Sequence, residues 1–284
     1  MKLSGHTLPF AVLGHPIGHT LSPVMHNASF AALKLDAIYL AFDVHPDRLM
    51  PVLHSMQELG FRGVNLTVPL KEVAFAQLER NDASAILLGA VNTVAFTDQG
   101  LVGHNTDGFG FLQAMEEAFG PCLTGEHIFV LGTGGAGRAV ALVSAGKGAK
   151  AITLSDVDQR RAEAVAAEIR SHHPALPVTC VDADAPIEAA RAADVIVQST
   201  PIGMKPDDPP LLPADAFQPG QKVFDLIYMY PETAFLAQAR QGGATIANGL
   251  AMLLHQGARA FEIWTGKSAD IEAMRQALER AVYQ

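Results

Sequence analysis

One stretch of sequence decides the fold: Ile128-Phe129-Val130-Leu131-Gly132-Thr133-Gly134-Gly135-Ala136-Gly137. The four apolar residues predict a buried strand, and the glycines after them predict a tight turn that opens a helix-like stretch from Arg138. In such a turn one glycine allows the bend, the next lets the backbone approach a pyrophosphate, and the last lets helix and strand pack closely. The free N–H groups at the helix start then bind the anion. The stretch therefore predicts a dinucleotide-binding turn.

A second apolar strand supports this interpretation. Residues 151–154 are followed by Ser155 and Asp156, which places a carboxylate where it can accept hydrogen bonds from the adenine-side ribose. Further strands are expected near 178–181, 195–198, 223–227 and 245–247, with alanine-rich helices between them. Six strands joined by such crossovers predict a doubly wound parallel sheet of Rossmann type.

The residues before this region are numerous enough for a domain of their own, because the chain has 284 residues and domains usually have about 100 to 200. Short apolar strands alternate there with helical stretches and end in a hairpin near 90–104, which predicts a small α/β domain. We expect a substrate-binding and catalytic domain over 1–107 and the Rossmann-type domain over 108–248. Helices over 249–284 are expected to pack back on the first domain.

Composition excludes several classes of partner. The formal net charge is −9 and no run of lysines or arginines is present, so nucleic acid and anionic lipid are not expected partners. No stretch approaches the roughly 18 to 20 apolar residues of a membrane span. The spacing of Cys122 and Cys180 fits neither a zinc site nor a disulfide framework. We expect a soluble cytoplasmic protein without a metal, and monomer and homodimer both remain open.

A nicotinamide enzyme also needs a group that moves a proton while the cofactor moves a hydride. Lys71 is a candidate because it follows the polar turn that begins at Asn65, although a lysine there is also typical of a solvated helix start. Asp107 is a second candidate at the boundary between the expected domains. The bare sequence equally allows it to form an Asx turn or a helix N-cap.

Several motifs in order make the chain resemble a known family. They are Gly14–Pro23 (GHPIGHTLSP), Gly63–Glu72 (GVNLTVPLKE), Gly89–Thr93 (GAVNT), Asn105–Gly108 (NTDG), Gly132–Gly137, Asp225–Tyr228 (DLIY) and Asn248–Leu253 (NGLAML) with Gln256. Together they resemble the shikimate dehydrogenase family over nearly the whole chain. The resemblance implies reversible NAD(P)-dependent oxidation of shikimate to 3-dehydroshikimate in aromatic amino-acid biosynthesis, with the substrate held by the N-terminal domain.

The resemblance also assigns roles to residues. Thr20 and Ser22 match the hydroxyl pair that binds the substrate carboxylate, with a threonine in place of the first serine of the common Ser-x-Ser. Lys71 and Asp107 match the catalytic pair, which can relay one proton. The residues that match contacts to the ring hydroxyls are Asn65, Thr67, Asn92, Asp107 and Gln256. Tyr228 is expected either to contact substrate or nicotinamide or to belong to the core. His15, His19 and His104 lie near these motifs, and we expect them to support the site rather than to act as bases.

The residues that match the cofactor site are Gly132, Gly134, Gly135, Ala136, Gly137, Asp156, Thr200 and Gly249. Many family members carry Asn-Arg-Thr after the second Rossmann strand, where the arginine meets the 2′-phosphate of NADP. This chain has Asp156-Val157-Asp158 instead. A carboxylate there bonds a free ribose hydroxyl but repels a phosphate, and Val157 supplies no cation. We therefore expect NAD to be preferred over NADP, with Arg160 and Arg161 facing solvent beside nearby acids.

Two alternatives remain open. The aspartate is similar to that of NAD-preferring quinate/shikimate dehydrogenases, so quinate is a possible substrate. Quinate carries an extra hydroxyl on the carbon that bears the carboxylate, which makes Thr20 and Ser22 the place of discrimination, and the small Ser22 favours shikimate. A ligand sensor that binds without turnover is the other alternative, and the presence of both Lys71 and Asp107 argues against it.

Overall fold

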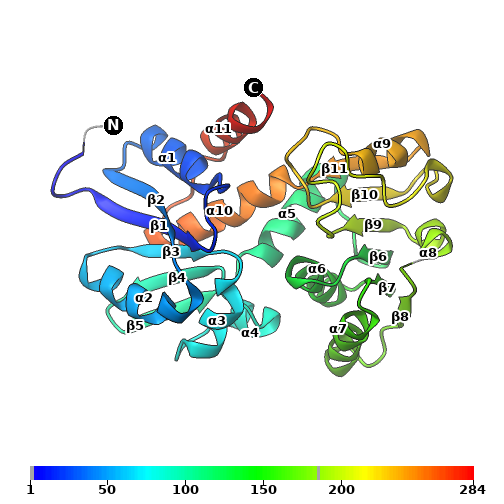
Figure 1. Cartoon of the computed structure of the whole chain (residues 1–284), viewed down its shortest axis with the longest axis horizontal. Coiled ribbons are helices and arrows are strands. Elements are labelled where there is room, and N and C mark those ends of the chain that lie inside the picture. Colours follow the sequence, from blue (N-terminus) through cyan, green and yellow to red (C-terminus); the bar gives the residue numbers. More distant parts are fainter. Residues whose placement is uncertain (1–2, 184–185) are drawn as a thin grey trace. The chain divides into compact units, whose positions relative to one another are not determined.

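The computed structural model describes residues 3–183 and 186–284, and the chain divides into two compact units (Figure 1). The first unit runs to Gly110 and also includes Leu253–Val282. The second unit covers Phe111–Met252. Both boundaries fall inside helices, α5 (Asp107–Phe119) and α10 (Leu250–Thr265).

The first unit is built on a five-stranded sheet of order β2-β1-β3-β4-β5. Its strands are β1 (Leu8–Gly14), β2 (Ala37–Asp43), β3 (Gly63–Leu66), β4 (Thr93–Thr97) and β5 (Gly100–His104). β1 pairs in parallel with β2 and β3, whereas β3, β4 and β5 are antiparallel. The α/β class and the hairpin expected near 90–104 are therefore confirmed.

Short helices connect these strands. They are α1 (Ser22–Ala32), the 3₁₀ turn η1 (Pro46–Arg48), α2 (Leu49–Glu58), α3 (Leu70–Gln77) and α4 (Ala83–Leu88), and α11 (Ile271–Tyr283) ends the chain. Helix α3 ends at Gln77, because Leu78 already has an extended backbone. Helix α4 was not predicted. Its start is fixed by Asp82, whose carboxylate accepts hydrogen bonds from the N–H groups of Ser84 and Ala85.

Apolar side chains cover both faces of this sheet. Leu13 and Leu66 lie in a cluster with Leu53 of α2 and Leu70 of α3, all buried; burying each such side chain contributes about 1.5–3 kcal/mol. An aromatic cluster includes Phe10 of β1, Phe30 of α1, and Phe261 and Trp264 of α10. The indole N–H of Trp264 donates to the carbonyl of Val94 at 3.0 Å. Helix α10 is thereby fixed against the sheet.

The second unit contains a six-stranded sheet of order β11-β10-β9-β6-β7-β8, and its strands pair in parallel. The strands are β6 (His127–Leu131), β7 (Ala151–Ser155), β8 (Val178–Val181), β9 (Val195–Gln198), β10 (Lys222–Asp225) and β11 (Thr245–Asn248). The order reverses between β6 and β9, as in a doubly wound fold. The predicted Rossmann-type sheet is confirmed.

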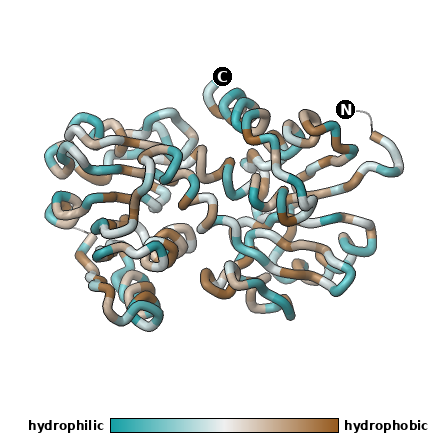
Figure 2. The backbone as a smooth tube through the Cα atoms, turned by 180° about the vertical axis from the view of Figure 1, so that it is seen from behind, coloured by the Kyte–Doolittle hydropathy of each residue, from teal (hydrophilic) through white to brown (hydrophobic). Residues whose placement is uncertain are grey.

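Helices cover this sheet on both faces. They are α5, α6 (Gly135–Gly146), α7 (Gln159–His172), α8 (Ile187–Ala192) and α9 (Ala234–Gln241), with the 3₁₀ turn η2 (Ala214–Ala216). Phe129 of β6 lies in one cluster with Ala190 of α8 and Phe235 of α9. Its neighbours in the strand point to the opposite face, and both Ile128 and Val130 are fully buried. Figure 2 shows such hydrophobic stretches in brown along the backbone.

Two details differ from the predictions. Helix α6 begins at Gly135 rather than at Arg138. Strand β10 ends at Asp225, because its carboxylate accepts the N–H of Ile227 at 3.0 Å and turns the chain. The C-terminal helical stretch is two helices, interrupted where Gly266 has a φ of 66°. No helix within 3–183 or 186–284 is long and apolar enough to cross a membrane.

Candidate active site

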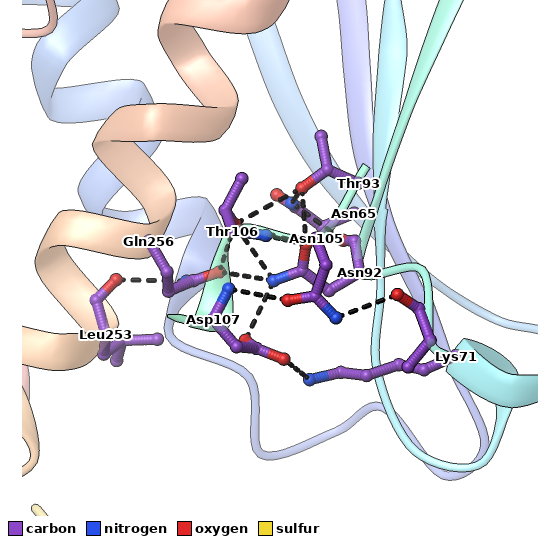
Figure 3. A network of polar contacts seen from close by, with 10 residues as sticks. Asn65, Lys71, Asn92, Thr93, Asn105, Thr106, Asp107, Leu253 and Gln256 are labelled. Carbon is purple, nitrogen blue, oxygen red and sulfur yellow. Dashed lines mark hydrogen bonds and ion pairs between the residues drawn. The ribbon is translucent and has the colours of Figure 1, made fainter. Parts of the chain in front are cut away.

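Lys71 and Asp107 form an ion pair in the first unit (Figure 3). Lys71 lies in the first turn of α3 and Asp107 is the first residue of α5. The lysine Nζ is 2.6 Å from Oδ2 of the aspartate. Their side chains are 28% and 17% exposed, so both can be reached by a small molecule. A cation and a carboxylate at this distance share hydrogen-bonding protons.

Each partner of this pair is held by its neighbours. The main-chain N–H of Asp107 donates to Oδ1 of Asn105 at 2.9 Å, and its own Oδ1 accepts the side-chain amide of Asn92 at 2.8 Å. The carbonyl of Lys71 accepts the N–H of Val91 at 2.9 Å. Lys71 and Asp107 are thus both hydrogen-bonded to the two residues just before β4, Val91 and Asn92 respectively.

Asn92 is the centre of the polar network. Its Oδ1 accepts the N–H of Thr106 at 2.8 Å and the hydroxyl of Thr93 at 2.9 Å. Its Nδ2 donates to the hydroxyl of Thr106 and to Asp107, and lies 3.4 Å from Oε1 of Gln256. Gln256 comes from α10, so this helix completes the network (Figure 3).

Asn65 lies deeper and is almost fully buried. Its Nδ2 donates to the carbonyl of Asn92 at 3.1 Å and to the hydroxyl of Thr93 at 3.0 Å. Both amide hydrogens are therefore used by the protein. Oδ1 accepts the hydroxyl of Tyr39 at 2.6 Å, which leaves it one further lone pair for a ligand hydroxyl.

The hydroxyl pair Thr20 and Ser22 stands at the start of α1. The Thr20 hydroxyl donates to that of Ser22 at 3.3 Å, and also accepts the main-chain N–H of Ser22 at 3.3 Å. Thr67 follows β3, and its methyl group lies so close to Gly14 that a side chain there would clash. Thr67 thus lies just after the strand that carries Asn65, whereas Thr20 and Ser22 lie at the start of α1.

The neighbouring histidines pair with carboxylates outside the Lys71–Asp107 pair. Nδ1 of His15 is 2.6 Å from Asp43, and Nδ1 of His104 is 2.7 Å from Asp82. The second contact ties β5 to the start of α4. His19 is exposed.

The glycine turn of the second unit fits a dinucleotide. Gly132 has a φ of 85°, which favours glycine, and a Cβ at Gly137 would lie 2.0 Å from the carbonyl oxygen of Gly132. The turn therefore packs against the helix start only because both residues are glycines. At Gly134 and Gly135 an added Cβ would meet no protein atom within 4 Å, so the backbone is open to a phosphate there. Thr200 lies beside Gly132.

Asp156 at the end of β7 is tied to the same turn. Its Oδ2 accepts the N–H and the hydroxyl of Thr133 at 2.7 and 2.9 Å, and Oδ1 accepts the N–H of Asp158 at 2.9 Å. Burial acts to raise the pKa of Asp156, but these hydrogen bonds and Arg161, 3.9 Å away, outweigh it and lower the pKa. Val157 is 92% exposed. The site therefore presents a fixed negative charge and an uncharged neighbour.

Tyr228 and Gly249 belong to the second unit. Tyr228 is half-buried beyond β10, and burial raises its pKa. A Cβ at Gly249 would lie 2.0 Å from the carbonyl oxygen of Leu226, so a glycine is needed there for packing alone. Neither residue is part of the network around Asn92.

Comparison with known proteins identifies the family. Residues 12–94 match the family model described as the shikimate dehydrogenase substrate binding domain, and residues 249–279 match the shikimate 5′-dehydrogenase C-terminal domain. A shikimate dehydrogenase (NADP+) from Moorella thermoacetica is 45% identical over 96% of this chain and 92% of its own length. The chain belongs to the shikimate dehydrogenase family.

Solved structures of related enzymes have the same fold over nearly their whole length. A shikimate 5-dehydrogenase from Listeria monocytogenes, in complex with shikimate and NAD, has a TM-score of 0.90 and 36% identity and covers 98% of both chains. A quinate dehydrogenase from Corynebacterium glutamicum, in complex with NAD, has a TM-score of 0.89 and 31% identity over 96% of this chain and 99% of its own. The shikimate dehydrogenase fold thus occurs with more than one substrate.

Sequence reasoning missed four polar residues in this member of the shikimate dehydrogenase family. They are Tyr39, Thr93, Asn105 and Thr106. Three of them lie inside motifs that the resemblance uses, and buried polar side chains next to a candidate site are a usable signal. Tyr39 lies in a mostly apolar strand, and its place there predicts a core residue.

Proposed function

We propose that this chain catalyses the reversible oxidation of shikimate to 3-dehydroshikimate, with NAD or NADP as the hydride acceptor. The observation that carries the proposal is the Lys71–Asp107 pair at 2.6 Å, set in a network of amide and hydroxyl groups. The first unit supplies an unusual density of neutral hydrogen-bonding groups, which suits a polyhydroxylated ring. Family membership supports the same reaction.

The substrate contacts follow from the placement of these groups. Thr20 and Ser22 bind the carboxylate, because two hydroxyls at the start of a helix are suited to an anion. The ring hydroxyls are held by Lys71 and Asp107 and by the amides and hydroxyls around them, which are Asn65, Thr67, Asn92 and Gln256. Asn65 contributes only as an acceptor, since its two amide hydrogens are already used. Tyr228 is proposed as a further contact to substrate or nicotinamide.

The chain's own part in the reaction is proton transfer. A bound nicotinamide would supply the hydride acceptor for the ring carbon that carries the reacting hydroxyl. Lys71 and Asp107 both bond that hydroxyl and take up its proton as its oxygen becomes a carbonyl. Asn92 keeps the Asp107 carboxylate oriented by donating to its other oxygen.

The glycine turn over Gly132–Gly137 is proposed to hold the pyrophosphate, together with the start of α6. Gly249 and Thr200 are proposed as further contacts to the nucleotide. Asp156 retains a lone pair on Oδ1 that can accept a ribose hydroxyl, and its charge disfavours a 2′-phosphate. Arg160 is 94% exposed and paired with Asp158, and Arg161 lies 3.9 Å from the Asp156 carboxylate, so each of these two cations has a carboxylate partner. We therefore propose a preference for NAD.

A quinate or dual-specificity dehydrogenase is the second candidate. It is favoured by the aspartate at position 156 and by the likeness to an NAD-bound quinate dehydrogenase. Ser22 favours shikimate, because a serine is smaller than a threonine at the same place. A non-catalytic sensor is disfavoured by the intact Lys71–Asp107 pair.

We also propose that the enzyme acts in the cytoplasm as a monomer or homodimer, consistent with the free thiols of Cys122 and Cys180.

The direct test is product formation by the purified protein. With shikimate and NAD or NADP, reduced nicotinamide and 3-dehydroshikimate should form in equal amounts, and the reverse reaction should consume both. The double variant Lys71→Ala/Asp107→Asn serves as the control for contaminating activity. Cofactor binding without any product from shikimate or quinate would overturn the proposal and favour a sensor.

A further inference from the structure

Tyr39 lies behind the candidate site and has no direct access to a substrate. It is in β2, and only 1% of its surface is exposed. Its hydroxyl donates to Oδ1 of Asn65 at 2.6 Å. Burial raises the pKa of Tyr39 well above its usual value, so the hydroxyl keeps its proton as a donor. One buried phenol thus donates directly to Asn65, a residue of the proposed ring-binding network.

The direction of these hydrogen bonds is fixed. The main-chain carbonyl of Asn92 can only accept, so the Asn65 amide must turn its NH₂ group toward it. Oδ1 of Asn65 then faces Tyr39, which has to donate.

From Asn65 the chain of donors continues to the catalytic pair. Nδ2 of Asn65 donates to the hydroxyl of Thr93, which donates to Oδ1 of Asn92. Nδ2 of Asn92 then donates to Asp107. Every hydrogen in this series points toward the Asp107 carboxylate, so the orientation of each amide depends on the group before it (Figure 3).

The position of Tyr39 is itself determined by several contacts from α1. The ring of His26 stacks on the ring of Tyr39, with centroids 4.3 Å apart and an angle of 8° between the planes. The side chain of Asn27 donates to the carbonyl of Tyr39 and accepts its N–H, both at 2.9 Å. Since β2 is an edge strand, Asn27 supplies the hydrogen bonds that a further strand would make. Backbone and ring are therefore both fixed, which places the hydroxyl accurately.

We infer that Tyr39 is a positioning residue for the reaction: through Asn65, Thr93 and Asn92, its hydroxyl aligns the acceptor Asp107 at the catalytic end. The inference rests on the proposed oxidation of shikimate. It differs from a packing role, because it assigns the effect to one oxygen atom rather than to the aromatic ring.

The test removes that oxygen and keeps the ring. Tyr39→Phe should raise the KM for shikimate and lower kcat, with kcat/KM reduced about tenfold, the worth of a well-placed buried hydrogen bond. The KM for NAD should stay within about twofold. Phe10→Leu is the matched control, because Phe10 packs in the neighbouring aromatic cluster through its ring alone. It should lower the Tm while leaving kcat/KM within about twofold of wild type.

A double-mutant cycle separates action through Asn65 from a general loss of stability. In an Asn65→Ala background, Tyr39→Phe should lower kcat further by less than about twofold, because the route to Asp107 is already broken. Equal effects of Tyr39→Phe on kcat in both backgrounds, or a kcat/KM for the single variant like that of Phe10→Leu, would overturn the inference.

A readout without turnover keeps the test independent of the proposed function. The side-chain amide resonances of Asn65 and Asn92 should both shift in Tyr39→Phe and remain in place in Phe10→Leu. If wild type fails to oxidise shikimate, the proposed function fails, whereas unchanged amide resonances in Tyr39→Phe would refute the positioning role by itself.

Discussion

The Nζ atom of Lys71 lies 2.6 Å from Oδ2 of Asp107, although the two residues are 36 positions apart in the chain. The first stands where β3 leads into α3 and the second where β5 leads into α5. Because β4 is antiparallel to both β3 and β5, these two strands run in the same direction and their carboxyl ends lie at the same end of the sheet. The two turns meet there. The fold thereby brings a lysine and a carboxylate together from segments that are far apart in the sequence.

Replacing Lys71 by alanine should lower kcat by roughly 100- to 10,000-fold, the usual contribution of a positioned acid or base. The measurement is steady-state oxidation of shikimate, with thermal melting to show that the variant folds. Lys34→Ala, at an exposed position, is the matched control and should retain wild-type rates. Near-normal turnover in Lys71→Ala would remove the lysine from the mechanism.

Lys71 and Asp107 should also act as a unit. Asp107→Asn is expected to lower kcat by a similar factor, and the double variant should be little slower than either single one, because groups that transfer one proton together are not additive. Multiplication of the two single effects in the double variant would mean that the residues act independently.

Thr20→Val should weaken substrate binding more than turnover. The change keeps the shape of the side chain and removes one hydroxyl from a charged ligand, which is worth about 1.5–3 kcal/mol. The KM for shikimate should therefore rise roughly 10- to 100-fold while kcat changes little. An unchanged KM would show that the carboxylate binds elsewhere, and the KM for NAD serves as the internal reference.

The cofactor preference should depend on positions 156 and 157. We expect Asp156→Asn combined with Val157→Arg to shift the ratio of kcat/KM values from NAD toward NADP, because it removes a repelling charge and adds a cation at an exposed position. Asparagine keeps an acceptor for the N–H and hydroxyl of Thr133, so the turn should stay intact. An unchanged ratio would mean that another contact selects the cofactor.

His26 should make the protein sensitive to acid. Burial lowers its pKa from 6.5 to about 3, so between those values the unfolded chain binds a proton that the folded protein does not. Stability is therefore lost as the pH falls below about 6.5, by about 1.4 kcal/mol per pH unit from this group.

The variant His26→Phe tests this, because it cannot titrate. Its Tm should fall less than that of wild type between pH 7 and pH 5, whereas His172→Phe, the same change at an exposed helix position, should follow wild type. Parallel pH profiles for His26→Phe and wild type would contradict the assignment.

The sheet of the second unit could be predicted closely because its strands are short apolar runs separated by alanine-rich helices. β8 and β9 coincide with the predicted ranges, and the sheet was predicted as doubly wound and parallel. The ends of helices and strands were less predictable, because single side chains determine them. The carboxylate of Asp225 ends β10, and that of Asp82 starts α4. Neither effect produces a periodic pattern of apolar residues in the sequence.

The candidate site could be predicted only where a motif named it. Lys71, Asp107 and Asn92 lie in such motifs, and the structure places them in one network. Tyr39 could not be predicted, because its hydroxyl matters only once β2 and β3 lie on either side of β1. In the sequence it is one more aromatic residue in an apolar strand.

The most direct test of the central claim compares kcat/KM for shikimate and quinate, each with NAD and NADP, under one set of conditions. Shikimate with NAD should give the highest value, in agreement with the roles proposed for Ser22 and Asp156. Comparable values for quinate would move the enzyme to the dual-specificity alternative, and a higher value with NADP would contradict the role of Asp156. Absence of turnover in all four combinations, with NAD still bound, would contradict the proposed reaction itself.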